Sequence, residues 1–168
     1  MNTKNTPVLL LIFTFLLVAV AGCADKVPAD DHFKAGKTFY DKKDYKKALR
    51  EFSDGIEAAP KDPRGYFYQG NTYMSLGHDE MAITAYQKSV ELDQSHAQTY
   101  YNLGIALTSA DKPIRAMAAY DKTLELDPNN AKAYYNKSAI LEKLGRADEA
   151  TAALQKAIKL QPDIIKPK

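Results

Sequence analysis

The sequence predicts an all-α chain built from four helix-turn-helix repeats, and three observations support this prediction. Apolar side chains recur at helical spacing, as Tyr100, Leu103 and Leu107 do. The second helical segment of that unit ends at Asp127-Pro128, because proline lacks an amide proton and stops a helix. The whole pattern returns every 34 residues, and a fixed period of this size is typical of stacked repeats.

The four repeats lie end to end and share three registers. One register holds alanine in the second helix, the next holds an aromatic residue or leucine, and the third holds glycine or serine in the first helix. The repeats are 29–62, 63–96, 97–130 and 131–164, and the registers are Ala48, Ala82, Ala116 and Ala150; Phe52, Tyr86, Tyr120 and Leu154; and Gly36, Gly70, Gly104 and Ser138. The small residues predict close helix packing, and the aromatic residue is expected to fill the gap between one helix pair and the next. Because one pair cannot bury its own apolar face, the pairs must stack.

The period and the coincident registers resemble the tetratricopeptide repeat (TPR) family over nearly everything after residue 28. The resemblance implies a right-handed α-solenoid whose first helices line a concave groove for a partner segment. Gly77 and Gly145 lie at the tight turn inside two repeats, whereas Lys43 and Asp111 depart from the family pattern there, so those two turns are less well defined by sequence. The expected helices are 30–42, 44–58, 63–76, 79–92, 97–109, 113–126, 131–144 and 147–160.

The first 23 residues have the composition of an export signal. Lys4 precedes an apolar run, Val8–Val20, and small residues lead to Cys23. The ending Val20–Cys23 is similar to the lipobox of bacterial lipoproteins. This resemblance implies a signal peptide over 1–22, lipid on the sulfur of Cys23 and a linker over 23–28. The alternative is an uncleaved anchor helix with an incidental cysteine.

These features predict an exported protein that is anchored to a membrane by lipid on Cys23. If the source is a Gram-negative bacterium, Ala24 after the cysteine favours the periplasmic face of the outer membrane, since the aspartate associated with inner-membrane retention is not at that position. The chain has one cysteine, so it forms no intrachain disulfide.

Composition and motifs argue against several functional classes. The net charge of +2 gives no reason to expect charge-driven nucleic-acid binding. The sequence has no glycine-rich phosphate loop and no nucleophile elbow. None of the histidines His32, His78 and His96 has a cysteine or carboxylate at metal-ligand spacing along the chain, and His32 is expected to be a packed aromatic residue. We therefore expect no catalytic residues, no metal and no cofactor.

The candidate binding site is the groove that the resemblance implies. Aromatic side chains give large contact area at low entropic cost, and asparagine both donates to and accepts from an extended backbone. The candidate residues are Phe33, Lys37, Arg64, Phe67, Tyr68, Asn71, Tyr101, Asn102, Lys132, Tyr135 and Asn136. The alternative is that these residue types reflect only the ancestral repeat pattern.

The charges expected along the groove favour an acidic or polar partner. The cations Lys34, Lys37, Arg64, Lys132 and Lys143 outnumber the carboxylates Asp30, Asp41 and Glu142. Some family members grip a chain-terminal carboxylate with basic residues and asparagines, and Asn71, Asn102 and Lys132 match that set. Phe67 and Asn136 replace two of its basic residues, so we do not expect binding of a chaperone tail.

The C-terminal end lacks a closing helix. Residues 165–168 form a short tail, and Ile158, Leu160, Ile164 and Ile165 would leave apolar surface exposed after the last repeat. Either the tail folds back on the last helix, or this end forms a homodimer or meets a partner. The sequence as a whole predicts a membrane-anchored adaptor that binds a protein or peptide in cell-envelope assembly. The alternatives are a self-associating structural protein and, less favoured, an enzyme.

Overall fold

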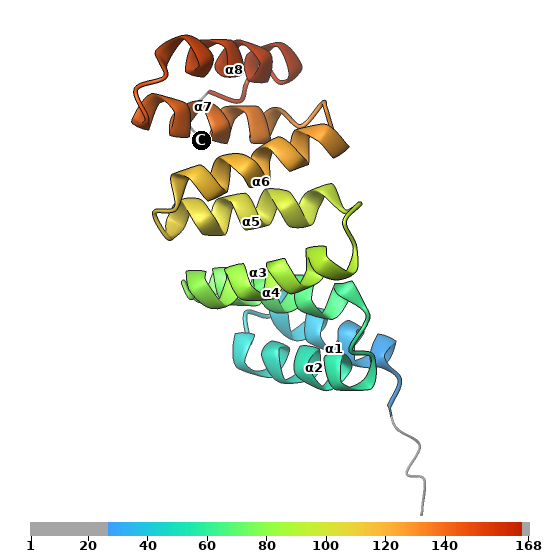
Figure 1. Cartoon of the computed structure of the whole chain (residues 1–168). Coiled ribbons are helices and arrows are strands. Elements are labelled where there is room, and N and C mark those ends of the chain that lie inside the picture. Colours follow the sequence, from blue (N-terminus) through green and yellow to red (C-terminus); the bar gives the residue numbers. More distant parts are fainter. Residues whose placement is uncertain (1–26, 166–168) are drawn as a thin grey trace, which may run out of the picture.

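The computed structural model describes residues 27–165, which form eight α-helices and no strand. The helices are α1 (Ala29–Asp41), α2 (Tyr45–Ala58), α3 (Pro63–Ser75), α4 (Asp79–Leu92), α5 (Ala97–Ser109), α6 (Pro113–Leu126), α7 (Ala131–Lys143) and α8 (Ala147–Leu160). They stack as four pairs from one end of the molecule to the other (Figure 1). The all-helical repeat architecture predicted from sequence is confirmed, and the predicted bounds differ from the observed ones by one residue at most.

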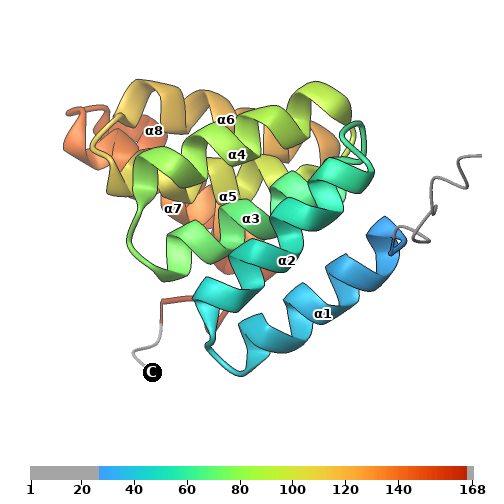
Figure 2. The ribbon, with the colours of Figure 1, turned by 90° about the horizontal axis from the view of Figure 1, so that it is seen from below.

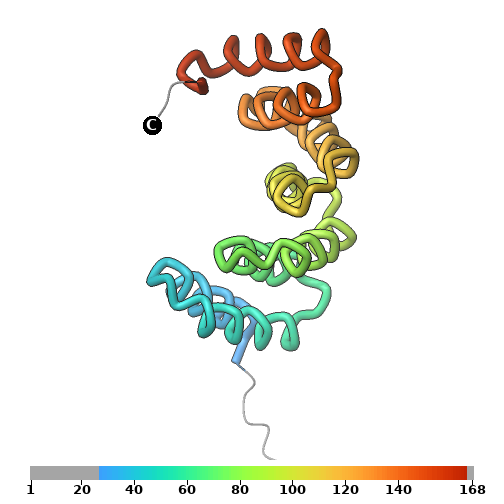
Figure 3. Tube along the Cα trace, turned by 90° about the vertical axis from the view of Figure 1, so that its left-hand side faces the viewer, coloured from blue at the N-terminus to red at the C-terminus, as the bar shows by residue number. Residues whose placement is uncertain are grey.

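The stacked pairs form an arc, as the trace in Figure 3 shows. Each first helix packs on the second helix of its own repeat, and each second helix packs on the first helix of the next repeat. The first helices α1, α3 and α5 also contact one another in sequence order. They therefore lie together along one side of the array, and this is the side on which the groove was predicted.

The aromatic register is the centre of each of the first three repeats. Tyr120 is 1% exposed, and a Cβ added at Gly104 would lie 2.5 Å from its ring. Tyr86 has the same relation to Gly70. The ring thus fills the space above the glycine of its own repeat. It also packs against the next repeat, as predicted, since the Phe52 ring stacks on Tyr68 at 5.3 Å between centroids. The fourth repeat carries Ser138 and Leu154 at these registers, where no aromatic ring requires a glycine.

The turns inside the four repeats share one conformation. Gly77 and Gly145 have positive φ angles of 73° and 72°, and Lys43 and Asp111 reach 60° and 53°. A side chain makes this left-handed region unfavourable. The turn geometry is therefore set by the packing of the paired helices, and the two residues that depart from the family pattern adopt it under strain.

The ends of the chain differ in what the structure describes. The predicted signal peptide and Cys23 lie outside the described residues. Within residues 27–165, no helix combines the length and apolarity needed to cross a membrane. At the other end the chain turns after α8, where the Ile164 amide donates to the carbonyl of Gln161 at 3.1 Å. Ile164 is half-buried, and Ile165 is 53% exposed.

Candidate functional site: the groove along the first helices

A pair of asparagines joins the first helices of the second and third repeats. The Oδ1 atom of Asn71 accepts from the Tyr86 hydroxyl at 2.7 Å and from Asn102 Nδ2 at 2.8 Å. Gln98 Nε2 donates to Asn102 Oδ1 at 2.7 Å. Both asparagines are therefore held in one orientation. Among the described residues no hydrogen bond from the Nδ2 group of Asn71 is present, and Asn71 lines two hollows of the groove, where this group is available as a donor.

Two small hollows adjoin Asn71. One holds about 260 Å³ and the other about 190 Å³. Tyr40 and Asn71 line both of them; the first also has Met74, Ser75, Tyr86, Asn102 and Ile105, and the second has Lys37, Asp41, Phe52 and Tyr68. Each is smaller than the roughly 300–1,000 Å³ of a typical ligand pocket. Neighbouring hollows of this size, with the side-chain donor of Asn71 at their edge, suit alternate side chains of an extended peptide, because successive side chains of such a peptide point to opposite faces.

A third hollow lies near the start of α3. It holds about 250 Å³ and is lined by Pro63, Arg64, Phe67, Tyr68, Ser89, Asp93 and His96. The rings of Phe67 and His96 meet edge to face at 5.2 Å between centroids. Both apolar and charged side chains line the hollow.

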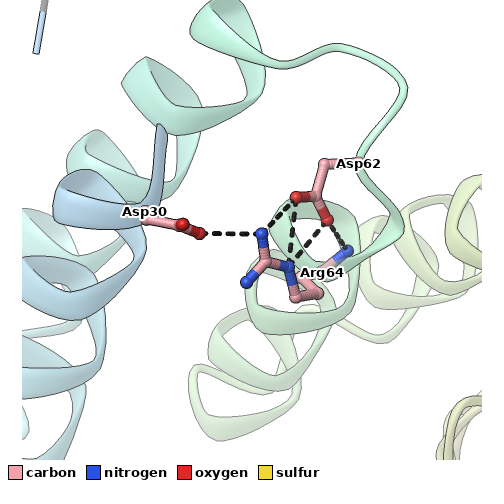
Figure 4. A network of polar contacts seen from close by, with 3 residues as sticks. All are labelled: Asp30, Asp62 and Arg64. Atoms are coloured by element: carbon pink, nitrogen blue, oxygen red, sulfur yellow. Dashed lines mark hydrogen bonds and ion pairs between the residues drawn. The ribbon is translucent and has the colours of Figure 1, made fainter. Parts of the chain in front are cut away.

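Arg64 is neutralised by its neighbours. Its guanidinium bonds to the Asp62 carboxylate at 2.6 Å and to Asp30 of the preceding repeat at 2.8 Å (Figure 4). It also stands 5.3 Å from the centre of the Phe33 ring. These hydrogen bonds raise the pKa of Arg64 and hold the pKa of Asp62 below its usual range. Arg64 was predicted to supply a groove cation, but in the structure it joins the first two repeats.

The aromatic residues predicted for the groove differ in exposure along the array. Phe33 is 3% exposed and packs in the core of the first repeat, so it offers no surface to a partner, in contrast to the prediction. Phe67 and Tyr101 are half-buried, and Tyr135 is 40% exposed. Asn136 Nδ2 donates to the Tyr101 hydroxyl at 3.3 Å. Burial raises the pKa of Tyr101, which keeps its hydroxyl neutral.

The remaining cations of the groove are few. Lys143 pairs with Asp111 at 2.6 Å, and Lys37 lies 5.6 Å from the centre of the Tyr68 ring. In residues 27–165, Lys34 and Lys132 take part in no ion pair. With Arg64 and Lys143 paired, the positive excess expected from sequence shrinks, and the groove favours a polar partner over a strongly acidic one.

A polar cluster outside the predicted set lies between α1 and α2. His32 Nδ1 lies 2.9 Å from Glu51 Oε2, and Asp54 stands beside them. Spacing along the chain missed this cluster because its members come from two helices. A comparison of repeats would have found it, since all three residues depart from the residue types that the other repeats have in the same registers.

Comparisons with known proteins agree with the repeat architecture. Family models described as TPR repeat and as tetratricopeptide repeat match residues 70–109, 97–130 and 119–152. Among curated proteins, none matches this chain. The chain is similar to the crystal structure of MamA, with 26% identity, a TM-score of 0.79, and coverage of 86% of this chain and 84% of that one.

Two further solved structures carry peptide sites in their descriptions. YrrB, described as a TPR protein with an unusual peptide-binding site, has 25% identity and a TM-score of 0.74 over 82% of this chain and 71% of its own. The first TPR of Spaghetti (RPAP3), bound to the HSP90 peptide SRMEEVD, has 25% identity and a TM-score of 0.69 over 72% of this chain and 96% of its own.

Proposed function

We propose that the chain is an adaptor that binds an extended peptide segment of a partner protein along its first helices, without chemistry of its own; tetratricopeptide-repeat models match residues 70–109, 97–130 and 119–152. The observation that carries the proposal is Asn71, held by Tyr86 and Asn102 at the edge of two hollows. An extended peptide presents a backbone carbonyl at regular intervals. Asn71 Nδ2 donates to one such carbonyl, while alternate side chains of the peptide enter the hollows of about 260 and 190 Å³.

The chemistry of the groove favours a neutral or polar segment. The RPAP3 domain binds a peptide with two glutamates and a terminal aspartate. In this chain the positive charge of the groove is reduced, because Arg64 is bonded to two carboxylates. Half-buried rings at Phe67, Tyr68 and Tyr101 supply apolar contact instead.

The substitution Asn71→Asp tests this proposal at one atom. It keeps the oxygen that accepts from Tyr86 and Asn102, and it replaces the outward donor with an acceptor. We expect binding to weaken about 3–10-fold, the equivalent of one net hydrogen bond. Asn129→Asp, in an exposed turn, is the matched control. The measurement is fluorescence anisotropy on a panel of neutral, basic and acidic peptides with the full chain in a mild detergent. Equal binding by Asn71→Asp and the control would contradict the role of this donor, and preferential binding of acidic termini would contradict the partner chemistry.

We further propose that the protein is exported, lipid-anchored through Cys23, and active in cell-envelope assembly. The support is the sequence pattern before Cys23, a short apolar run followed by small residues. Mass spectrometry of the native protein should then show a chain that starts at Cys23 and carries added acyl mass. An intact Met1 terminus would argue for the uncleaved anchor helix.

Self-association is the second candidate function, and exposed apolar side chains favour it. Ile165 at the C-terminal end is 53% exposed, and Ile114 at the start of α6 is 65% exposed. Contacts through these residues would assemble copies of the chain. Light scattering on the full chain in detergent distinguishes the two functions, since a monomer at all concentrations is expected only of an adaptor that binds a different partner.

A further inference from the structure

Three side chains with metal-ligating atoms meet at the interface of α1 and α2. His32 extends from α1, and Glu51 and Asp54 extend from α2, three residues apart on one face. One ligand atom from each lies within 4.8 Å of the other two. The side chains of His32 and Glu51 are only 19% and 26% exposed. Figure 2 shows these two helices side by side at the N-terminal end of the array.

The other repeats show that stacking does not require this combination. At the register of His32 they have tyrosine, at that of Glu51 they have alanine, and at that of Asp54 they have lysine. The sets are Tyr66, Ala85 and Lys88; Tyr100, Ala119 and Lys122; and Tyr134, Ala153 and Lys156. The first repeat differs from the other three at all of these positions, and the residues it has there, His32, Glu51 and Asp54, lie close together in the structure.

The change also concentrates negative charge on α2. In the second and third repeats the lysine pairs with a glutamate three residues later, as Lys88 does with Glu91 at 3.0 Å. The first repeat keeps that glutamate as Glu57 but replaces the lysine with Asp54. Glu51, Asp54 and Glu57 thus follow one another at intervals of three, an arrangement in which like charges repel. Arg50 approaches Asp54 only at 4.0 Å and is 83% exposed, so it compensates weakly.

We propose that His32, Glu51 and Asp54 bind a divalent transition-metal ion, of the class of Zn²⁺, between α1 and α2. An imidazole nitrogen with two carboxylate oxygens suits Zn²⁺ or Co²⁺, whereas Ca²⁺ and Mg²⁺ take oxygen ligands. Bonds of about 2.0–2.2 Å place tetrahedral ligand atoms roughly 3.3–3.6 Å apart. The three ligand atoms lie within 4.8 Å of one another, and the proposal requires the side chains to adjust to the shorter spacing.

The surroundings leave space for the rest of the coordination shell. A hollow of about 230 Å³ adjoins the site and is lined by Val27, His32, Asp54, Glu57 and Ala58. Water or the exposed carboxylate of Glu57 completes the shell from this side. The bound ion joins the two helices of the first repeat, which packs against one other repeat within residues 27–165. This site is independent of the peptide groove and goes beyond the proposed function.

The test compares the parent chain with a variant in which His32, Glu51 and Asp54 are replaced by the residues that the other three repeats have at the same positions. The full chain in mild detergent is stripped of metal and melted with increasing Zn²⁺, because an ion that binds only the folded state raises the melting temperature. We expect a rise with Zn²⁺ and visible absorption bands with Co²⁺. The triple variant His32→Tyr, Glu51→Ala, Asp54→Lys should fold and lose both signals.

A single substitution and a control variant keep the test informative if the triple variant does not fold. Asp54→Asn keeps the shape of the site and should weaken Zn²⁺ binding at least tenfold, which remains measurable if the triple variant does not fold. His78→Ala, in an exposed turn, is the control and should respond as the parent chain does. Every chain also carries Cys23→Ser, since a free thiol binds Zn²⁺ as well. No response of the parent chain, an equal response of Asp54→Asn, or an equal response to Ca²⁺ would overturn the assignment.

Discussion

The packing of Tyr120 on Gly104 gives the sharpest prediction about the fold. A Cβ at residue 104 would lie 2.5 Å from Tyr120 Cε1 and 2.8 Å from both Cδ1 and Cζ. Carbon atoms in normal contact are about 3.5–4.0 Å apart, so the ring or the helix would have to move by about 1 Å. Tyr120 is 1% exposed and has no free space to enter. Gly104→Ser should therefore destabilise the chain.

The magnitude follows from two opposing effects. Overpacking of a filled core costs about 1–3 kcal/mol. Serine is a better helix former than glycine by a few tenths of a kcal/mol, or about 0.5 at most, which offsets part of that cost. We expect a net loss of about 1–2 kcal/mol and a fall of about 2–4 °C in melting temperature for each kcal/mol. Circular dichroism during chemical and thermal denaturation measures both quantities.

Measuring Gly104→Ser in a chain that also carries Tyr120→Leu tests whether the tyrosine ring is the cause of this cost. Tyr120→Leu reproduces the pairing of the fourth repeat, which has serine and leucine at these registers. In this background the additional cost of Gly104→Ser should fall below about 0.5 kcal/mol, because residues in contact have coupled effects on stability. Tyr86→Leu, one repeat away, is the control background and should give no rescue. An equal cost of Gly104→Ser in all three backgrounds would show that the ring does not set the glycine requirement.

Three further predictions concern the turns, the groove and the C-terminal end. Lys43→Gly should stabilise the chain by about 0.5–1 kcal/mol in denaturation, since φ at this residue is 60° and a side chain costs roughly 1–2 kcal/mol there; an unchanged or lower stability would show that the turn is unstrained. Phe67→Ala with Tyr101→Ala should weaken peptide capture while far-ultraviolet circular dichroism stays constant, and full capture would place the partner elsewhere. If the C-terminal tail folds back on α8, Ile158→Ser with Ile165→Ser should lower the stability of the chain while its molar mass in light scattering stays constant. If the C-terminal end is an interface, the same change should convert a dimer to a monomer. No effect on either stability or molar mass would exclude both alternatives.

The sequence by itself determined the architecture of this protein. A period of 34 residues repeated four times restricts each apolar position to one role, so even the helix bounds agree with the structure to within one residue. Local signals were enough for this, because proline, glycine and the spacing of apolar residues act within one or two helical turns. The export signal and Cys23 likewise rest on sequence alone, and the structure describes residues 27–165 only.

Only the tertiary structure decided which side chains of a register are available. Phe33 and Tyr135 occupy the same position in their repeats, yet one is 3% and the other 40% exposed. Arg64 and Tyr68 of the following repeat pack against the Phe33 ring, whereas no further repeat follows that of Tyr135 within residues 27–165. Whether a charge is free or neutralised depends on partners from neighbouring repeats, and periodicity carries no information about them. The meeting of His32 with Glu51 has the same origin, since it depends on how two antiparallel helices align, and residues 19 apart in the chain come within 2.9 Å.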